Sequence, residues 1–169
     1  NGDGFIARFD REGDELGRFQ TPVDVAIDIA WDGENCWYTP YRGHENIYLM
    51  DREGEHLRTV VLGNDVGHDA WASMEFVPDH VDGQLWFRDH DLSIYQLNVD
   101  VDGDEVEIIQ EHQMNVGNEF GLAHDGENIW YTLDGQWIVM DDNADELHLL
   151  KISEEEGEIP GGEEVSVVF

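Results

Sequence analysis

The sequence predicts an all-β protein built from repeated sheets of four antiparallel strands. A near duplication is the main reason: residues 29–39 read IAWDGENCWYT, residues 122–132 read LAHDGENIWYT, and eight of the eleven positions are identical. A looser copy, VDGQLWFR, occupies residues 81–88. The Asp-Gly pairs begin at positions 32, 82 and 125, and their spacings of 50 and 43 residues fit one four-stranded unit each. Because no segment repeats its apolar residues every 3.6 positions, almost no helix is expected.

The first full unit, residues 20–62, alternates short β-rich runs with turn residues. Asp32-Gly33 lies between two such runs, which is a strong signal for a hairpin. The expected strands of this unit are residues 23–31, 35–39, 46–51 and 56–62.

The second unit, residues 63–113, and the third, residues 114–152, repeat this order, with an insertion at residues 78–81. One Trp occupies the same second-strand position in each unit and is expected to pack between neighbouring sheets; these are Trp37, Trp86 and Trp130. The expected strands are residues 70–77, 84–88, 93–98 and 106–112 in the second unit, and 119–124, 128–132, 136–141 and 146–152 in the third.

The start of the chain resembles the second half of the first unit. Residues 6–16 read IARFDREGDEL, and residues 47–57 read IYLMDREGEHL. Residues 5–19 are therefore predicted to be the third and fourth strands of a preceding unit. After the array, which ends at residue 152, residues 153–162 form an acidic, Gly-rich linker, and residues 163–169 (EEVSVVF) form a terminal strand available for closing a ring.

The pattern x-A-x-D-G-x-x-x-W-Y, followed by an alternating strand that ends in Asp and a turn, carries a family resemblance. Over residues 5–152 it resembles the repeat of six- and seven-bladed β-propellers, in particular the NHL-like, glutamine-cyclotransferase-like and lactonase-like groups. The resemblance implies propeller blades of four antiparallel strands, with three full blades plus a half blade in this chain. The pattern departs from that of WD40 propellers, because Trp31-Asp32 ends a first strand rather than a third.

Three full blades and a half blade are too few for a closed six-bladed ring, and an open array exposes sheet faces and edges to water. Three explanations stay open. The chain is part of a longer propeller, or the strand at residues 163–169 joins residues 5–19 to close a four-bladed ring, or identical chains form a homo-oligomer that completes one larger ring.

The charge of the chain restricts its environment and its partners. Forty acidic residues, spread along the whole chain, face eight basic ones, of which only one is Lys, for a net charge of -32. This composition is typical of haloarchaeal proteins adapted to molar salt, where the Debye length falls to about 3 Å and carboxylate repulsion is screened. A calcium-loaded protein is the alternative. Repulsion excludes nucleic acids as partners, and membrane insertion is excluded because no run of 18 apolar residues occurs.

Ligands of propellers bind at one end of the central channel, where the fourth-to-first and second-to-third strand connections meet. The candidate ligand-binding residues in those loops are Arg42, His44, His68, Asp69, Arg88 and His90. Since Arg is scarce here, the two Arg side chains either pair with loop carboxylates or bind an anionic ligand. The three His residues match no local zinc motif. The single cysteine, Cys36, aligns with Leu85 and Ile129 and is expected to be a buried hydrophobe.

Calcium is the candidate ion, and no cofactor is certain from the sequence. A channel site would need carboxylate and amide oxygens from several blades, and Asp69, Asn118 and Glu119 are the candidates. Residues 98–103 imitate the first half of an EF-hand loop, but Ile109 stands where the bidentate Glu belongs. An acidic turn between two strands is therefore the favoured interpretation of that segment.

The sequence favours a non-catalytic binding or structural propeller module that is adapted to high salt. Its expected role is recognition of a protein or a surface carbohydrate, or assembly within a larger extracellular or viral complex. An extracellular or virion-surface location is favoured over the cytoplasm. The alternative is an enzyme of the lactonase-like hydrolase or glutaminyl-cyclotransferase type, which would use a channel carboxylate or a divalent cation; no Gly-x-Ser-x-Gly nucleophile elbow occurs.

Overall fold

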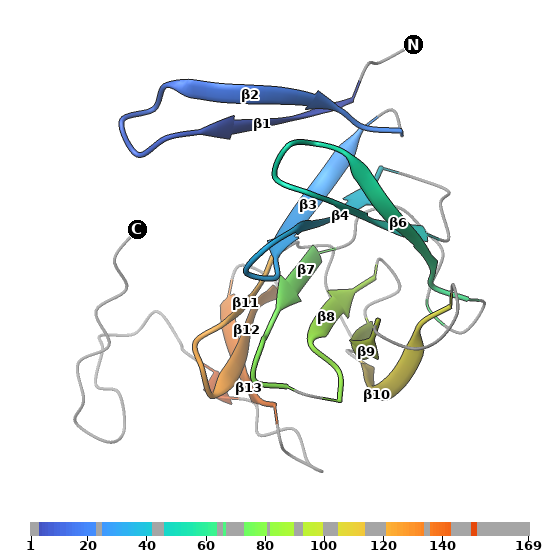
Figure 1. Cartoon of the computed structure of the whole chain (residues 1–169). Coiled ribbons are helices and arrows are strands. Elements are labelled where there is room, and N and C mark those ends of the chain that lie inside the picture. The colour runs from blue at the N-terminus through green and yellow to red at the C-terminus, as the bar shows by residue number, and fades with distance from the viewer. Residues whose placement is uncertain are drawn as a thin grey trace.

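Fourteen strands and no helix make up the part of the chain that the structure, a computed structural model, describes (Figure 1). The described residues are 4–22, 25–41, 46–63, 66, 73–80, 82–89, 93–99, 105–113, 121–133, 136–142 and 150–151. Within them no helix is long and apolar enough to span a bilayer. The linker and terminal strand predicted at residues 153–162 and 163–169 lie outside the described residues.

Three sheets of four antiparallel strands follow one another, each with its strands hydrogen-bonded in chain order. The first sheet comprises β3 (Ala26–Trp31), β4 (Cys36–Pro40), β5 (Asn46–Met50) and β6 (His56–Val61). The second comprises β7 (Ser73–Phe76), β8 (Leu85–Arg88), β9 (Ser93–Asn98) and β10 (Glu107–Gln113). The third comprises β11 (Leu122–His124), β12 (Asn128–Leu133), β13 (Gln136–Asp141) and β14 (Leu150–Lys151). A hairpin of β1 (Phe5–Phe9) and β2 (Glu15–Gln20) precedes them, so the predicted fold class is confirmed.

The duplicated Asp-Gly sequence forms the same turn twice. The Oδ1 atom of Asp32 accepts hydrogen bonds from the backbone N–H groups two and three residues further on, at 2.8 and 2.6 Å. Asp125 accepts the equivalent bonds at 3.0 and 2.8 Å. The following glycines, Gly33 and Gly126, have φ values of 103° and 109°, where a side chain would strain the backbone. The duplicated sequence therefore forms the same hairpin turn in the first and third sheets.

The corresponding hairpin of the second sheet differs because of its insertion. The N–H of Val77 donates to the carbonyl of Gln84 at 2.7 Å, so the bonded residues lie seven positions apart, against three positions for the bond from Asp32 to Asn35. Asp82 is exposed within this longer connection. Asp82 therefore lies in the same connection between first and second strands as Asp32, as the alignment predicts, but the turn around it is different.

The N-terminal hairpin is the counterpart of β5 and β6. Asp10 and Asp51 each accept bonds at Oδ1 from the backbone N–H groups two and four residues further on, at 3.0 and 2.8 Å for Asp10 and 2.9 and 2.8 Å for Asp51. Gly13 and Gly54 follow with φ values of 91° and 87°. The half blade is thus made of third and fourth strands, as the sequence predicts.

Apolar side chains fill the space between neighbouring sheets, and each sheet gives one face to each neighbour. Trp37 of β4 joins the cluster shared with the second sheet, whereas the adjacent Tyr38 joins the cluster shared with β1 and β2. Trp86 in turn packs against the third sheet. Each fully buried large side chain contributes about 1.5–3 kcal/mol, so these three clusters hold the radial array together.

The three repeat tryptophans confirm the packing prediction at two positions. Trp37 and Trp86 are 3% and 0% exposed, but Trp130 is only partly buried, on the face of the third sheet that points away from the second. Its indole Nε1 donates to Asp125 Oδ2 at 2.5 Å. Cys36 is buried as expected, and burial raises the pKa of its thiol to about 11.

Candidate functional site

Arg88 is the one residue of the predicted loop site that the structure describes. The other ligand-binding and calcium candidates lie outside the described residues, and their roles stay predictions: Arg42, His44, His68, Asp69, His90, Asn118 and Glu119. Arg88 is 2% exposed, and its Nη1 donates to the carbonyl of Thr132 in β12 at 3.4 Å. The guanidinium therefore bridges the second and third sheets.

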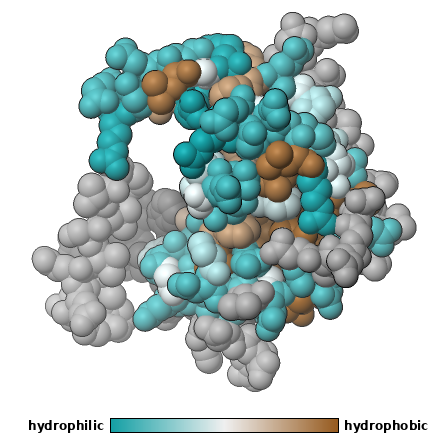
Figure 2. All heavy atoms as spheres, in the orientation of Figure 1, coloured by the Kyte–Doolittle hydropathy of each residue, from teal (hydrophilic) through white to brown (hydrophobic). Residues whose placement is uncertain are grey.

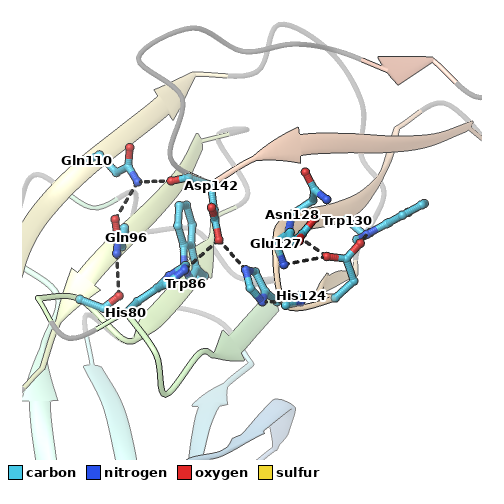
Figure 3. Close-up of polar contacts among 12 residues, drawn as sticks. His80, Trp86, Gln96, Gln110, His124, Glu127, Asn128, Trp130 and Asp142 are labelled. Atoms are coloured by element: carbon cyan, nitrogen blue, oxygen red, sulfur yellow. Dashed lines mark hydrogen bonds and ion pairs between the residues drawn. The ribbon is translucent and has the colours of Figure 1, made fainter. Parts of the chain in front are cut away.

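Three side chains that the sequence did not predict as a site lie close together at the strand ends opposite to Arg88. These are the ends at which β7 connects to β8 and β11 connects to β12. His80 lies in the β7–β8 connection, His124 ends β11, and Asp142 follows β13. Asp142 Oδ2 lies 2.8 Å from His80 Nε2 and 2.6 Å from His124 Nε2 (Figure 3). The carboxylate side chain is 2% exposed. One buried carboxylate oxygen is thus within hydrogen-bond distance of two imidazoles, which come from two neighbouring sheets.

The hydrogen bonds on the far side of each ring fix where its proton sits. The indole N–H of Trp86 donates to His80 Nδ1 at 2.8 Å, and the backbone N–H of Gly126 donates to His124 Nδ1 at 3.1 Å. An indole and an amide can only donate, so both Nδ1 atoms are acceptors and each neutral ring carries its proton on Nε2. Both Nε2–H groups therefore donate to Asp142.

This arrangement of protons is the reverse of what a metal centre needs. The ligating atoms of His80, His124 and Asp142 all lie within 4.8 Å of one another, so the donor set alone would suit a transition metal. A metal bound at Nε2 would leave the proton on Nδ1, where ligating histidines normally donate to an oxygen. Here the Nδ1–H of His80 would point at the indole N–H of Trp86, and that of His124 at the backbone N–H of Gly126, so neither would have an acceptor. The residues present fit a hydrogen-bonded joint between sheets, and they do not fit a metal.

The backbone of Asp142 extends the same joint. Its carbonyl accepts from Gln110 Nε2 at 3.2 Å, and this amide also donates to Gln96 Oε1 at 2.6 Å. Gln96 in turn donates to the carbonyl of Gly83 at 2.9 Å. Figure 3 shows this chain of side chains leading from β10 and β9 to the segment after β13. Asp142 therefore bonds the second sheet through both its side chain and its backbone.

The first sheet uses the same two positions differently. The strand registers place His124 at the position of Trp31, and Asp142 at the position of Arg52. In the first sheet the Arg52 guanidinium lies over the Trp31 ring, 5.8 Å from its centroid. A cation–π contact in one repeat is thus a carboxylate–imidazole contact in the other. The replacement of Trp by His and of Arg by Asp was the sequence signal for this cluster.

Titratable residues also lie on the inner strands β3, β7 and β11. Burial raises the pKa of Asp28 on β3, although hydrogen bonds from the N–H groups of Met74 and Ile29 oppose the shift. Burial likewise raises the pKa of Glu75 on β7, and the charge of Asp28 adds to this shift. The bond from Met74 N–H to Asp28 Oδ2, at 2.8 Å, joins β3 to β7. Asp28 and Glu75 both have raised pKa values, and they interact electrostatically across adjacent sheets.

The first sheet leaves part of one face uncovered. Ile29 and Trp31, which alternate on β3, are 52% and 50% exposed. Their counterparts in the third sheet are Leu122, which packs against the cluster shared with the second sheet, and His124, whose side chain is 6% exposed. The difference follows from the half blade, because β1 and β2 correspond to third and fourth strands and cover only the outer part of the first sheet.

The edge of β1 adjoins this uncovered face. Arg8 on β1 donates to the carbonyl of Arg52 at 2.5 Å, and Arg52 lies over Trp31. Among the described residues β2 is the one strand that pairs with β1. We call Ile29, Trp31 and the unpaired edge of β1 the open face. Figure 2 shows apolar atoms in brown on the N-terminal hairpin and on the body beneath it, within a largely hydrophilic surface.

Comparison with known proteins places the fold. No protein-family model matches the chain, and no curated protein matches it. Among 56 similar chains of solved structures is the crystal structure of BamB from Moraxella catarrhalis, a β-propeller, with a TM-score of 0.52 and 14% sequence identity. The match covers 82% of this chain and 40% of that one, so the chain spans less than half the length of BamB. The chain therefore has a β-propeller-like fold.

Proposed function

We propose that the chain is a non-catalytic binding module, adapted to high salt, that recognises an extended protein segment at the open face. The module serves assembly within a larger extracellular or viral complex, in a haloarchaeal setting. Its repeat is of the kind found in NHL-like, glutamine-cyclotransferase-like and lactonase-like propellers. A surface carbohydrate is the second partner class for the same module.

The exposure of Ile29 and Trp31 carries this proposal. Their counterparts in the third sheet are covered by the first and second strands of the preceding repeat. The open face is therefore the surface that two such strands would cover. An exposed apolar patch beside an unpaired strand edge is the arrangement that binds a peptide by strand addition. Main-chain hydrogen bonds from the peptide to β1 would supply affinity. Alternate side chains of the peptide, packed against Ile29 and Trp31, would supply specificity.

A synthetic peptide tests the proposal. Residues 121–133 of this chain form a first-and-second-strand hairpin of the kind that covers such a face elsewhere in the array. In about 2 M KCl we expect this peptide to bind the full chain with a dissociation constant below about 1 mM, or about 4 kcal/mol.

Trp31→Glu should weaken that binding at least about tenfold, or about 1.4 kcal/mol. Leu57→Glu is the matched control, because Leu57 is also 50% exposed but lies on β6, away from the open face. Calorimetry or fluorescence anisotropy reports both values. Absence of binding to the full-length wild type, or equal binding by Trp31→Glu and Leu57→Glu, contradicts the proposed function.

The inner-strand carboxylates favour a second candidate, a hydrolase or cyclotransferase that uses Asp28 and Glu75. A carboxyl with a raised pKa is suited to acid–base chemistry, and a pair of partly buried carboxylates is suited to holding calcium. Calcium titrated at fixed ionic strength should then raise the melting temperature of the wild type and leave Asp28→Asn unchanged. An unchanged melting temperature in both proteins would remove the calcium-dependent version.

A further inference from the structure

We propose that the protein segment recognised at the open face is a β-strand that carries a tryptophan, and that Arg8 on β1 selects this side chain. The inference rests on the proposed function, because it names the chemistry of the partner at the same surface. In the complex the strand runs antiparallel to β1, its tryptophan lies opposite Arg8, and the indole packs on Ile29.

Arg8 occupies a position that lies opposite a tryptophan in every full sheet. The pairing of Arg8 with Gly17 on β2 is the counterpart of the pairing of Leu49 with Arg58 on β6, as the shared DREG turns require. Leu49 in turn lies opposite Trp37 on the second strand of its sheet. The residues opposite the other two repeat tryptophans, Trp86 and Trp130, are Gln96 and Val139. A second strand added to β1 therefore places its tryptophan position opposite Arg8.

One position on the following sheet contacts the indole cluster at both described interfaces between full sheets. Trp37 shares its cluster with Met74 on β7. Leu122 on β11 packs against the cluster that contains Trp86. Met74, Leu122 and Ile29 are equivalent, because each pairs with the residue that follows the repeat tryptophan of its own sheet. Met74 is 2% exposed but Ile29 is 52% exposed, so among the described residues Ile29 is the one whose tryptophan is missing.

Arg8 supplies a cation that the full sheets do not have at this position. Its guanidinium lies 5.8 Å from the centroid of the Phe19 ring, and its Nη1 donates to the carbonyl of Arg52, so the side chain lies on the face of β1 that points towards the first sheet. Directly opposed Cβ atoms in a sheet are about 4.5–5.5 Å apart, which brings an opposing ring within reach of this guanidinium. Tryptophan is the best cation–π partner among the aromatic side chains.

A carboxylate opposite Arg8 is the main alternative. It would form an exposed ion pair, which is weak in water and is screened further in molar salt. It would also place a charge against the apolar side chain of Ile29, in a chain whose net charge of -32 repels acidic partners. An indole carries no charge and buries the apolar surface of Ile29. The aromatic residue is therefore favoured over an acid.

The strand comes from a partner protein rather than from a second copy of these sheets. Within the described residues the repeat tryptophans lie on β4, β8 and β12, and each of these strands is paired on both sides. None of the three has an unpaired edge to offer β1.

Variants of the hairpin peptide 121–133 test the inference, with binding to the full chain measured by fluorescence anisotropy in about 2 M KCl. Trp130 holds the repeat position in this peptide, and Tyr131 points to the other face of the strand. We expect Trp130→Leu to weaken binding at least about tenfold, and Tyr131→Leu, the matched control, to weaken it less than about threefold. Trp130→Glu should weaken binding at least as much as Trp130→Leu.

Arg8→Leu in the full chain tests the selecting residue, because it installs the side chain that the first full sheet has at this position, Leu49. The preference of the chain for the unmodified peptide over the Trp130→Leu peptide should fall at least about threefold. Arg11→Leu, at an exposed turn position of the same hairpin, removes the same charge and should leave that preference unchanged.

The outcomes separate this inference from the proposed function. Equal binding of the unmodified, Trp130→Leu and Trp130→Glu peptides overturns the inference but leaves the proposed function in place, since the open face then binds strands whatever this side chain is. A larger loss from Tyr131→Leu than from Trp130→Leu means that the strand docks with its other face, which also overturns the inference. An undiminished preference in Arg8→Leu refutes selection by Arg8. Absence of binding by the unmodified peptide instead contradicts the proposed function itself.

Discussion

The indole N–H of Trp86 donates to Nδ1 of His80 at 2.8 Å, and this one bond decides which ring nitrogen of His80 carries the proton. Trp86 is fully buried, so the donor cannot turn away without disturbing the cluster between the second and third sheets. The bond links the apolar core to the polar joint at Asp142.

The proton positions give a direct spectroscopic prediction. We expect nitrogen chemical shifts at neutral pH to report the Nε2–H tautomer for both His80 and His124. Because a metal at Nε2 would oppose two fixed N–H donors, zinc added at fixed ionic strength should leave the melting temperature unchanged. Zinc protection that is lost in Asp142→Asn would contradict the hydrogen-bonded joint and establish a metal centre.

Asp142 should dominate the stability of this joint. Asp142→Leu removes the acceptor of two buried N–H groups, each of which costs about 1–3 kcal/mol when left unsatisfied. Asp142→Asn keeps one carbonyl oxygen and should cost less than Asp142→Leu. Asp82→Asn, at an exposed position, should change the free energy of unfolding by less than about 0.5 kcal/mol. Denaturant unfolding in high salt measures all three, and equal costs for the three variants would refute the role of Asp142.

The raised pKa of Asp28 predicts a pH-dependent difference between two proteins. Burial raises this pKa above its ordinary 3.8, so the folded chain holds a proton that the unfolded chain releases. The wild type therefore loses stability as the pH rises from about 4 through the folded pKa. Asp28→Asn still accepts the bond from Met74 but carries no charge.

We accordingly expect Asp28→Asn to be more stable than the wild type at pH 7 and equal to it near pH 4. The free energy of unfolding, measured across this range at constant high salt, gives the difference. Glu53→Gln, on an exposed turn, serves as the control that removes one negative charge without removing a buried one. A constant difference at every pH would show that burial of Asp28 is not the cause.

The repeat tryptophans should differ in what they contribute. Trp37→Ala empties a buried site and should cost about 3–5 kcal/mol. Trp130→Ala, at a partly buried position, should cost clearly less and leave the β11–β12 turn in place. Denaturant midpoints of the two variants measure the contrast. Equal losses would mean that Trp130 is covered in solution.

Salt should be required for stability. Screening lengths fall from about 10 Å near 0.1 M salt to about 3 Å near 1 M, so repulsion within a chain of charge -32 weakens steeply. We expect the melting temperature to rise continuously between about 0.1 and about 2 M KCl. A flat curve over that range would remove the argument for halophilic adaptation.

Local chemistry made the sheets predictable from the sequence. Asp32 and Asp125 precede glycines in turns that need a positive φ, and the DREG sequences at Asp10 and Asp51 encode a second turn type in the same way. These signals act within a few residues, so they can be read without knowing what lies across the sheet. The insertion before Asp82 broke the pattern because it changed the length of the turn.

The cluster around Asp142 was not predictable, because it depends on a contact between sheets. His80 comes from an insertion that has no counterpart in the other repeats, and only the packing of the second sheet on the third brings it to Asp142. The pair of His124 and Asp142 did leave a trace, as substitutions of Trp31 and Arg52 at aligned positions. Loop residues such as Arg42 and His68 stay predictions, since they lie outside the described residues.

The matching turns at Asp32 and Asp125 bear on the history of the molecule. The first and third hairpins agree more closely with each other than either does with the hairpin between them, which suggests that a stretch of two blades was copied as a unit. The residue before the Asp-Gly pair differs between the two copies, Trp31 in the first and His124 in the third, while the bonds from the backbone to the Asp side chain are the same. With Trp at this place the first blade ends in a contact with Arg52 at the surface, whereas His, together with Asp142 and His80, gives the third blade a buried joint.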